Sequence, residues 1–509
     1  MRKPERRTGP LRRELGERLQ NYEVWGVIGE GGMSRVWLAR HQLLAIPVIV
    51  KTVHAEYASD TAGRARVVEE AKLMAKISSP RVVRALDAGV HDHHPFLVEQ
   101  YVDGVDMAEL DRRRRRALGV GFPLWFVCEV MQAACEALYS AHRTGVVHRD
   151  MKPSNLFGCP QTGIRLGDFG IAALARESEG ASEITGTARF MAPEQFEGTG
   201  PSPACDVWGA GATAFDLRYG RVPFSTLAAV LDKDAGPEMP PPASPAEAYF
   251  QHVLRGMLAK DPADRPRDIQ EPLQHFSTLG RLLRAPVHHH GVVALDRTTY
   301  RVHGCTVRFT QGDLVESRAD AIVSSASDTM TMRSGVGQAL RVAGGDTIEH
   351  EAKAHGRQPL GSCVATRAGR LSARHVLHAV SAWREASCVG RATQRALLLA
   401  DELGHRSLAF AALGTGAAKV SVETCASAMM TALVQHLALG GTHLRDVEIV
   451  MLDPRSFETY REVAAGVLHG QVDLSIRDVG LPAAERQVTG DGATWVDVRG
   501  RGNGSTDPD

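Results

Sequence analysis

Four polar residues in two short motifs have the types and the order that phosphoryl transfer requires. The motif HRDMKPSN contains Asp150, Lys152 and Asn155, and the motif GDFG follows it with Asp168. Asp150 could accept the proton of a substrate hydroxyl group, and Lys152 could neutralise the phosphoryl group in transit. Asn155 and Asp168 carry oxygen ligands of the kind that hold Mg²⁺ beside nucleotide phosphates. Together the motifs predict transfer of a phosphoryl group from ATP to a hydroxyl group.

A cluster of glycines near the N-terminus is a candidate phosphate-binding loop. The segment VIGEGGMSRVWLA includes Gly29, Gly31 and Gly32. Such a cluster alone could be a simple turn or part of a dinucleotide site, but a dinucleotide loop opens a helix. The residues from Arg35 to Ala39 instead continue as a second strand. We therefore expect a hairpin whose backbone N–H groups cover the phosphates of ATP.

Two charged residues farther along the chain could orient those phosphates. Lys51 ends the apolar strand IPVIVK, from which its side chain can reach the α and β phosphates. Glu70 lies on the following helical segment and can pair with Lys51. An exposed charge is the usual interpretation of either residue taken alone. The motifs around Asp150 and Asp168 favour the functional interpretation.

Residues 22 to 284 resemble a eukaryotic-type bacterial serine/threonine protein kinase of the Hanks type. The segments GTARFMAPE, DVWGAGAT and KDPADRP add to the resemblance, and Lys152 with Thr187 matches its serine/threonine variant. It implies an α+β fold of two lobes, a small N-terminal lobe built on a sheet and a helical C-terminal lobe, with ATP and Mg²⁺ between them. It also implies protein substrates and a buried ion pair between Glu194 and Arg265.

The same resemblance defines the surroundings of the adenine. It implies that Val36, Tyr101 and Val102 contact the nucleotide. Glu99 stands where similar kinases carry an apolar residue at the back of the adenine pocket. A carboxylate there could be desolvated or could pair with a nearby base. Because burial of an unpaired carboxylate is costly, we expect Glu99 to weaken ATP binding relative to an apolar side chain.

The resemblance also suggests control by phosphorylation. In such kinases an arginine in the position of Arg149 usually pairs with a phosphate on the activation segment. Ser178, Ser182 and Thr185 are the candidate acceptors in this sequence. We therefore expect activity to depend on phosphate between Ala172 and Thr185.

A second patterned region alternates strands with helices from about residue 300 to residue 474. This alternation predicts an α/β domain with a largely parallel sheet. Two glycine-bearing turns, SGVGQAL and LGTGAAKVS, each follow a strand and lead toward a helical pattern. Such turns can present backbone N–H groups to an anion, and two of them would suit a diphosphate. Turns that only need glycine for their backbone conformation are an equally good interpretation of the residues alone.

The segments TQGDLVESRADAIVSSASD, SGVGQALRVAGG, PLGSCVATRAGRL, HVLHAV and RSLAFAALGTG resemble, in this order, a macro domain from residue 300 to about residue 470. The resemblance implies a three-layer α/β/α fold that binds ADP-ribose. Asp313 would accept a hydrogen bond from the adenine amino group. The residues implied to line the phosphates and ribose are Gly335, Val336, Gly337, Gly414, Thr415, Gly416 and Ala417.

This region departs from hydrolytic macro domains at two places. Where those members carry two asparagines in an N-x-x-N pair, this chain has Ser324 and Ser327. Gly337 stands where one de-ADP-ribosylating branch has an aspartate. Serine is shorter than asparagine and lacks its amide, so we expect ADP-ribose to bind but not to be hydrolysed efficiently. Hydrolysis of protein-linked ADP-ribose, and a macro fold that serves only as a docking surface, are the alternatives.

The composition is that of an ordinary globular protein with several domains. A chain of 509 residues is too long for one hydrophobic core. Its 59 basic and 59 acidic residues cancel, which argues against a general nucleic-acid or membrane-surface binder. No apolar run approaches the roughly 18 residues of a membrane span. The eight cysteines are scattered without a C-x-x-C pair, which favours reduced thiols and a cytoplasmic location.

We expect five segments along the chain: a charged arm (1–21), the kinase-like region (22–284), a linker (285–299), the macro-like region (300–475) and a partly disordered tail (476–509). A run of five arginines, from Arg112 to Arg116, could bind acidic partners. Its place on a predicted surface helix favours a solvated face instead. The whole sequence is most consistent with a signalling kinase that carries a sensor of ADP-ribose, free or on proteins. The rival hypothesis is a pseudokinase scaffold with an active macro hydrolase, against which Lys51, Asp150 and Asp168 argue.

Overall fold

The computed structural model describes residues 18–19, 21–30, 34–44, 46–53, 72, 74–91, 94–159, 163–169, 186–197, 200, 202–288, 291–383, 386–416 and 418–469. All of them belong to one compact unit. Several residues of the sequence analysis lie outside these ranges. They are Gly31, Gly32, Glu70, Ser178, Ser182, Thr185 and Ala417, together with most of the arm and the tail.

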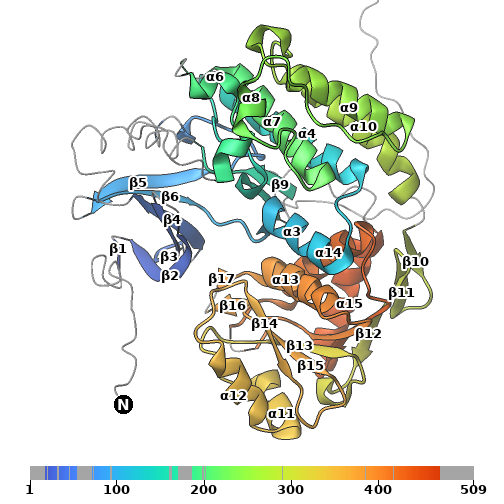
Figure 1. Cartoon of the computed structure of the whole chain (residues 1–509). Helices are drawn as coiled ribbons and strands as arrows, with labels where there is room; N and C mark the ends of the chain where they lie inside the picture. The colour runs from blue at the N-terminus through green and yellow to red at the C-terminus, as the bar shows by residue number, and fades with distance from the viewer. Residues whose placement is uncertain are drawn as a thin grey trace, which may run out of the picture. The chain divides into compact units, whose positions relative to one another are not determined.

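The N-terminal lobe is a six-stranded antiparallel sheet in the order β1-β2-β3-β4-β6-β5 (Figure 1). Its strands are β1 (Arg18–Leu19), β2 (Tyr22–Glu30), β3 (Ser34–His41), β4 (Pro47–Val53), β5 (Ala85–His91) and β6 (His94–Gln100). Val48 and Val50 of β4 are buried with Trp37 of β3 and Phe96 of β6 in one cluster. This apolar face makes the sheet a stable platform for the polar residues on its other face.

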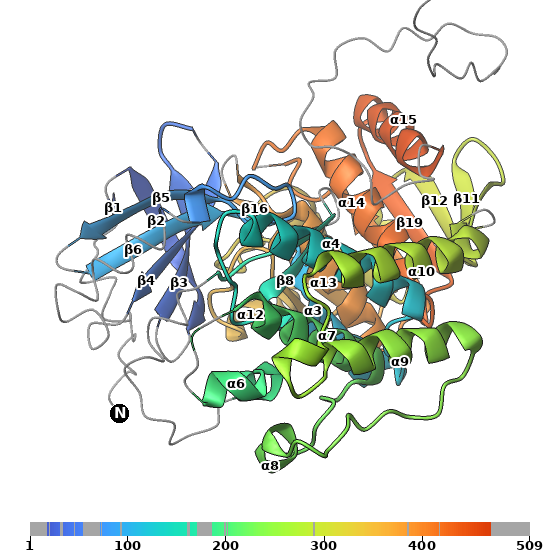
Figure 2. The same cartoon turned by 90° about the horizontal axis from the view of Figure 1, so that it is seen from above.

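The C-terminal lobe is helical, and it places the two catalytic motifs on a small sheet. Its longer helices are α3 (Met107–Leu118), α4 (Leu124–His142), α7 (Pro203–Tyr219), α9 (Pro245–Met257) and α10 (Gln270–His288). Helix α4 packs against α7 and α10 (Figure 2). The small sheet joins β7 (Val105–Asp106), β8 (Leu156–Cys159) and β9 (Gly163–Leu166). The HRDMKPSN motif ends where β8 begins, and the GDFG motif starts directly after β9.

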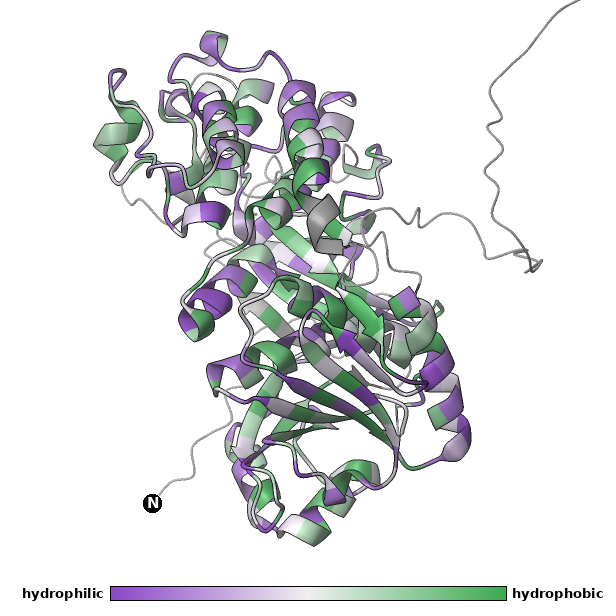
Figure 3. Ribbon diagram, turned by 90° about the vertical axis from the view of Figure 1, so that its right-hand side faces the viewer, coloured by the Kyte–Doolittle hydropathy of each residue, from purple (hydrophilic) through white to green (hydrophobic). Residues whose placement is uncertain are grey.

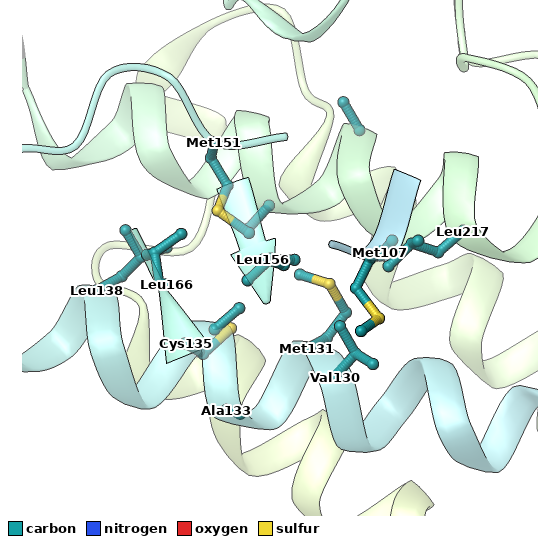
Figure 4. Packing of buried hydrophobic residues seen from close by; sticks show 14 of the residues in the cluster. Met107, Val130, Met131, Ala133, Cys135, Leu138, Met151, Leu156, Leu166 and Leu217 are labelled. Carbon is teal, nitrogen blue, oxygen red and sulfur yellow. The ribbon is translucent and has the colours of Figure 1, made fainter. Parts of the chain in front are cut away.

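Helix α4 is the centre of this lobe. Apolar residues recur along it at three- and four-residue spacing, as a buried helix face requires: Val127, Val130, Met131, Ala134, Leu138 and Ala141. Figure 4 shows Met131 and Leu138 among the side chains of the same core as Met151, Leu156 and Leu166. The catalytic loop is therefore anchored by apolar residues that lie within and just after its motif.

The second region is a three-layer α/β/α domain, as the sequence predicts. Its eight-stranded sheet has the order β10-β11-β12-β19-β18-β13-β15-β14. The five neighbouring strands β12, β19, β18, β13 and β15 are parallel to one another. The strands are β10 (Val292–Ala294), β11 (Thr299–Val302), β12 (Cys305–Gln311), β13 (Ala321–Ser325), β14 (Cys363–Arg367), β15 (His375–Ala379), β18 (Ser407–Ala411) and β19 (Asp446–Met451). A separate hairpin pairs β16 (Ala382–Trp383) with β17 (Ala386–Ser387).

Alternate residues of the central strand β13 are buried on opposite faces of the sheet. Ala321 and Val323 of β13 join a core with helices α13 (Val389–Glu402), α14 (Val422–Ala438) and α15 (Pro454–His469). Ile322 joins the other core, with α11 (Gly335–Gly344) and α12 (Thr347–Ala354). A strand buried on both faces reads as a continuous apolar run. The helices carry both hydrophilic and hydrophobic residues, as elements with one face in a core should (Figure 3).

The segment expected to be a linker is partly regular structure. Helix α10 continues to His288, and β10 pairs with β11 at the edge of the α/β sheet. Strand β10 thereby covers the free edge of β11, and the apolar pattern of the sequence does not predict this pairing. In the described part of the chain, no helix is long and apolar enough to cross a membrane.

The sequence predicts a solvated face for the arginine run, and that prediction is wrong for Arg113, Arg114 and Arg115, whereas Arg112 and Arg116 are exposed. Arg114 is buried, and its guanidinium donates to the carbonyl oxygens of Leu439 and Gly440, beyond α14, at 2.8 and 2.7 Å. Arg113 forms a two-pronged ion pair with Glu402 of α13, at 2.8 and 3.1 Å. Helix α3 thus binds the α/β domain through charges that a local sequence window cannot pair.

Candidate active site

The catalytic loop brings three predicted residues into direct contact. The Lys152 ammonium lies 2.9 Å from the Asp150 carboxylate. The Asn155 side-chain amide donates to the Asp150 backbone carbonyl at 2.7 Å and to its carboxylate at 3.3 Å. Asn155 and Asp150 are both buried. The contacts fix the direction of the Asp150 carboxylate, as a catalytic base requires.

A buried aspartate that the sequence analysis did not single out holds this loop in shape. Asp206 of α7 accepts hydrogen bonds from the backbone N–H groups of His148 and Arg149, at 2.8 and 2.7 Å. It also contacts the His142 ring at 2.7 Å. Arg149 has a positive φ of 67°, which costs a non-glycine residue energy, and the hydrogen bonds to Asp206 offset that cost. Its signal was present in the motif DVWGAGAT, where a single carboxylate begins an otherwise apolar helical run.

Lys51 joins the sheet of the N-terminal lobe to the GDFG motif. Its ammonium forms ion pairs with Asp168 and, at 2.6 Å, with Glu99. Burial acts to lower the pKa of Lys51, but the charges of Asp168 and Glu99 outweigh burial and raise that pKa. Burial raises the pKa of the Glu99 carboxyl, against the charge of Lys51. Glu99 is therefore both desolvated and paired, so the two alternatives considered for it coexist.

The remaining nucleotide-binding predictions lie on the same sheet or directly after its strand β6. Gly29 is opposite Val36 in the β2–β3 hairpin, where the register shifts. Val102 follows β6, and the side chain of its neighbour Tyr101 packs in a cluster with Met330 and Cys388 of the α/β domain. The described residues on either side of the glycine cluster form the two antiparallel strands that the sequence predicts, and residues 31–33 between them lie outside the described ranges.

The donor set at the catalytic motifs fits Mg²⁺. Because the Asn155 amide nitrogen is used by Asp150, the amide oxygen remains to bind a cation. The Asp168 side chain is 40% exposed and offers a carboxylate. Carboxylate and amide oxygens suit this hard cation, which usually takes its other ligands from phosphates and water. The described residues hold no group of three or more His, Cys, Asp or Glu that could bind a metal ion.

A cavity of about 390 Å³ opens beside Lys152. Arg189, Asp216 and Arg221 contribute charges to its lining. Burial raises the pKa of Asp216 to about 6, and the charge of Asp111 acts in the same direction. The cavity can therefore receive a polar side chain next to the catalytic loop.

The ion pair between Glu194 and Arg265 is present as expected. The guanidinium donates to both carboxylate oxygens, at 2.6 and 2.8 Å, and the Arg265 side chain is fully buried. Despite burial, which raises it, the pKa of Glu194 is lowered by the hydrogen bonds and the charge of Arg265. A two-pronged buried pair of this kind ties the segment after η3 (Gly186–Phe190) to the loop before α10.

In the α/β domain, the predicted ligand residues follow the carboxyl ends of parallel strands. Asp313 comes after β12, Ser327 after β13, and Gly414 after β18. The chain leaves β13 toward β14 and β15 on one side and then crosses to β18 and β19 on the other. Ligands of open α/β sheets bind at such a reversal of strand order. The topology therefore supports a binding site here independently of any motif.

The first glycine turn forms the start of a helix. Gly335, Val336 and Gly337 make up the first turn of α11, and Gly335 has a φ of 54°. The backbone N–H groups of a first helical turn have no partner within the helix and can bind an anion. Ser334, the capping residue, makes no side-chain cap. The turn is thus open to a ligand.

The second glycine turn leads into helix α14, as the sequence predicts, although its glycines lie several residues before the helix begins. Helix α14 begins only at Val422, with Ser421 as its cap. The backbone N–H of Val420 donates to the Gly414 carbonyl, which closes the loop on itself. The positive φ of Gly414, 79°, turns the chain there. Thr415 and Gly416 lie within this closed loop.

The serines at the end of β13 lie in different surroundings. Ser324 is buried at 1% exposure, with one long hydrogen bond to the Ser325 carbonyl. Ser325, which the sequence analysis did not select, contacts the Ser381 hydroxyl at 2.8 Å and accepts from the Gly414 N–H at 3.1 Å. Ser325 thereby links three of the loops at the reversal point. Ser325 is the last residue of a buried parallel strand, and this position in the sequence could have indicated a site residue.

Ser327 belongs to a small exposed group of hydroxyls. Its oxygen lies 3.1 Å from the hydroxyls of both Thr329 and Thr331. Asp313 accepts from the backbone N–H of Val315 and so caps η5 (Leu314–Glu316). The hydroxyl groups of Ser327, Thr329 and Thr331 can donate hydrogen bonds to a ribose, but they supply neither an amide nor a carboxylate for hydrolysis.

Residues 22–276 match the family model of the protein kinase domain. The chain belongs to the protein kinase family. Residues 323–429 match the model of the macro domain, so the kinase carries a macro domain toward its C-terminus.

Curated relatives of this kinase are bacterial serine/threonine-protein kinases. Serine/threonine-protein kinase Pkn1 of Myxococcus xanthus is 32% identical over 342 residues, 63% of this chain and 48% of the relative. Serine/threonine-protein kinase PknB of Mycobacterium tuberculosis is 30% identical over 262 residues, 48% of this chain and 40% of the relative. The kinase thus spans about half or less of the length of these relatives. Among solved structures, the PknI kinase domain of M. tuberculosis is 27% identical, with a TM-score of 0.42, and covers 52% of this chain and 96% of its own.

Proposed function

We propose that the chain transfers the γ-phosphoryl group of ATP to serine or threonine hydroxyls of proteins. The observation that carries this proposal is the contact between Asp150, Lys152 and Asn155, with the Lys51–Asp168 pair beside the same motifs. A pseudokinase has no need to keep all five groups in these relations. The relatives' names agree with this activity.

The residues divide the work in a simple way. Asp150 accepts the proton of the substrate hydroxyl while its carboxylate is held by Lys152 and Asn155. Lys152 also neutralises charge on the phosphoryl group, and Lys51 orients the α and β phosphates. Asn155 and Asp168 would hold Mg²⁺, which supplies positive charge to the phosphate oxygens when it is bound. The cavity beside Lys152 would receive a substrate side chain that neighbours the acceptor hydroxyl.

The test is transfer of labelled phosphate from ATP to the chain itself and to a generic basic protein. Asp150→Asn should lower kcat by several orders of magnitude and leave ATP binding nearly unchanged, because it removes only the base and its positioning role. Phosphoamino-acid analysis should find label on serine or threonine. An Asp150→Asn variant as active as the wild type, or a wild type that binds ATP without any transfer, would reject the assignment.

We further propose that the macro domain binds ADP-ribose and hydrolyses it from proteins poorly. The observation that favours binding is the set of loops at the strand-order reversal, with Gly335 to Gly337 at the start of α11. These backbone donors do not depend on the asparagines that the sequence lacks. The weak hydrolysis follows from Ser327 and Gly337, which supply neither amide nor carboxylate.

Calorimetry on the full chain tests this second function. We expect a Kd in the micromolar range, or about −8 kcal/mol, because few polar side chains hold the distal ribose. Asp313→Ala should weaken binding by about 1–3 kcal/mol through a lost hydrogen bond to the adenine. Asp346→Ala, whose side chain is 78% exposed on the same domain, is the control. Absence of heat would favour the docking-surface alternative, and rapid release of label from an ADP-ribosylated protein would favour hydrolysis.

A further inference from the structure

Strand pairing in the N-terminal lobe places Glu99 and Lys51 on the same face of the sheet. Glu99 of β6 is directly opposite Ile49 of β4, and Lys51 is two residues beyond Ile49 on the same strand. Residues two apart on a strand share a face, so Glu99 and Lys51 are diagonal neighbours within reach of long side chains. Their 2.6 Å ion pair therefore follows from the register of two paired strands.

The two carboxylates that contact Lys51 have unequal surroundings. The Glu99 side chain is 4% exposed, whereas that of Asp168 is 40% exposed. Glu99 comes from the same sheet as Lys51, whereas Asp168 comes from the other lobe and is the proposed cation ligand. When Asp168 binds a cation, less of its negative charge is available to hold Lys51. Glu99 is placed to hold the ammonium while Asp168 serves the cation.

Burial of Glu99 has a cost that Lys51 only partly offsets. One carboxylate oxygen contacts Lys51, and the other, Oε1, is buried with no hydrogen-bond partner in the described part of the chain. A buried acceptor without a partner destabilises the fold, and an apolar side chain of similar size would not. The stability of the protein therefore gives no reason for a carboxylate at this position.

We propose that Glu99 is a positioning residue for Lys51, holding its ammonium toward the nucleotide phosphates from within the sheet itself. This inference rests on the proposed kinase function. It adds a second carboxylate to the pairing of Lys51 with Glu70 that the sequence suggests. It also reverses the simple expectation that a carboxylate at the back of the adenine pocket only weakens ATP binding.

Two substitutions separate this role from a structural one. Glu99→Gln keeps a hydrogen-bond acceptor for Lys51, and Glu99→Met keeps the volume without any acceptor. We expect the KM for ATP to rise about tenfold in Glu99→Met and less in Glu99→Gln, since a hydrogen bond to a charged group is lost or weakened. The melting temperature of Glu99→Met should stay equal or increase. Glu271→Gln on the exposed side of α10 is the control, with unchanged KM and melting temperature.

A binding cycle in the Lys51→Met background completes the test and does not depend on catalysis. If Glu99 acts through Lys51, Glu99→Met should raise the Kd for ATP about tenfold in the wild type and less than about twofold in Lys51→Met. Equal effects in the two backgrounds, or a lower KM in Glu99→Met, would overturn the proposal. A wild type that binds ATP without transferring phosphate would reject the kinase function and leave this cycle interpretable.

Discussion

At the scale of single residues, the catalytic loop depends on a buried carboxylate that lies outside its own motif. Asp206 lies at 1% exposure and accepts hydrogen bonds from two consecutive backbone N–H groups of the loop. The second of these belongs to Arg149, whose backbone is in the left-handed region. The loop keeps its conformation because the Asp206 carboxylate accepts both of these hydrogen bonds at once.

Asp206→Asn should therefore lower catalysis more than nucleotide binding. The amide can accept only one of the two hydrogen bonds and turns an N–H group toward the other donor, which costs about 1–3 kcal/mol of folding stability. We expect kcat to fall at least about tenfold while the Kd for ATP changes less than about twofold. Urea unfolding and ATP titration of the same preparation measure both effects. A variant that loses stability with full kcat would show that the loop does not depend on Asp206.

A buried histidine should make the macro domain sensitive to acid. His378 of β15 is 1% exposed, and its ring contacts the Thr366 hydroxyl at 2.9 Å. Burial lowers the pKa of His378 to about 4, and the charge of His355 acts in the same direction. The unfolded chain takes up a proton near pH 6.5, where the folded domain does not. Stability present above about pH 6.5 should thus be lost as the pH falls toward 4, by about 3 kcal/mol for this residue.

Unfolding by urea at about pH 7, 5.5 and 4.5 measures that loss. His378→Gln keeps a hydrogen-bonding group for Thr366 but cannot titrate, so its stability should fall less over the same range. His350→Gln, at an exposed position of α12, should behave like the wild type. Identical pH dependence in the wild type and His378→Gln would contradict the assignment of the loss to His378.

At the scale of elements, helices α3 and α13 form the main contact between the kinase and macro domains. Glu109 of α3 and Arg395 of α13 form a two-pronged ion pair, at 2.9 and 2.7 Å, and both side chains are mostly buried. At the start of α13, Asp103 accepts from the N–H groups of Gly390 and Arg391. An aspartate at a helix N-terminus accepts hydrogen bonds from N–H groups that have no partner within the helix, and its negative charge interacts favourably with the helix dipole. The contact therefore combines backbone capping with side-chain pairing.

A double-mutant cycle on Glu109 and Arg395 should show coupling of about 1–2 kcal/mol, because the pair is two-pronged and partly shielded from water. Glu109→Gln and Arg395→Gln are the single changes. Arg221 and Glu238 form the control pair, since their side chains are 45% and 51% exposed and such pairs contribute little. Chemical denaturation of the four variants gives the coupling energy. Equal coupling in the two pairs would argue against a specific contact between α3 and α13.

At the scale of the whole molecule, the arginine run joins the domains into one folding unit. Arg114 binds two carbonyl oxygens beyond α14, and Leu398 and Leu439 of the macro domain belong to the hydrophobic core of the kinase lobe. Domains that share buried contacts unfold together, whereas domains joined by a weak contact unfold separately. The two domains should therefore unfold as one unit.

Calorimetry should accordingly show one unfolding transition for the wild type and two for Arg114→Ala. The substitution leaves buried carbonyl oxygens without a donor, which weakens the contact without touching either core. Arg112→Ala, two residues away at an exposed position, is the matched control and should keep one transition. Two transitions in the wild type, or one in Arg114→Ala, would contradict a shared folding unit.

Sequence alone determined the chemistry and the types of domain. Asp150, Lys152, Asn155 and Asp168 are recognisable because catalysis needs those residue types in that order, and the alternation of strands and helices predicts the α/β domain. Such signals are local, since each motif lies within one short stretch of chain. The parallel sheet and its helices follow from apolar runs of the same kind.

Only the tertiary structure decided which charges pair. Glu99 meets Lys51 because β4 and β6 are adjacent in the sheet, and Ser325 meets Gly414 because β13 and β18 are neighbours there. The arginine run appeared solvated because its partners, Glu402, Leu439 and Gly440, lie far along the chain. A charge is buried or exposed according to its neighbours in space, and these depend on strand order and domain contact rather than on a local sequence window.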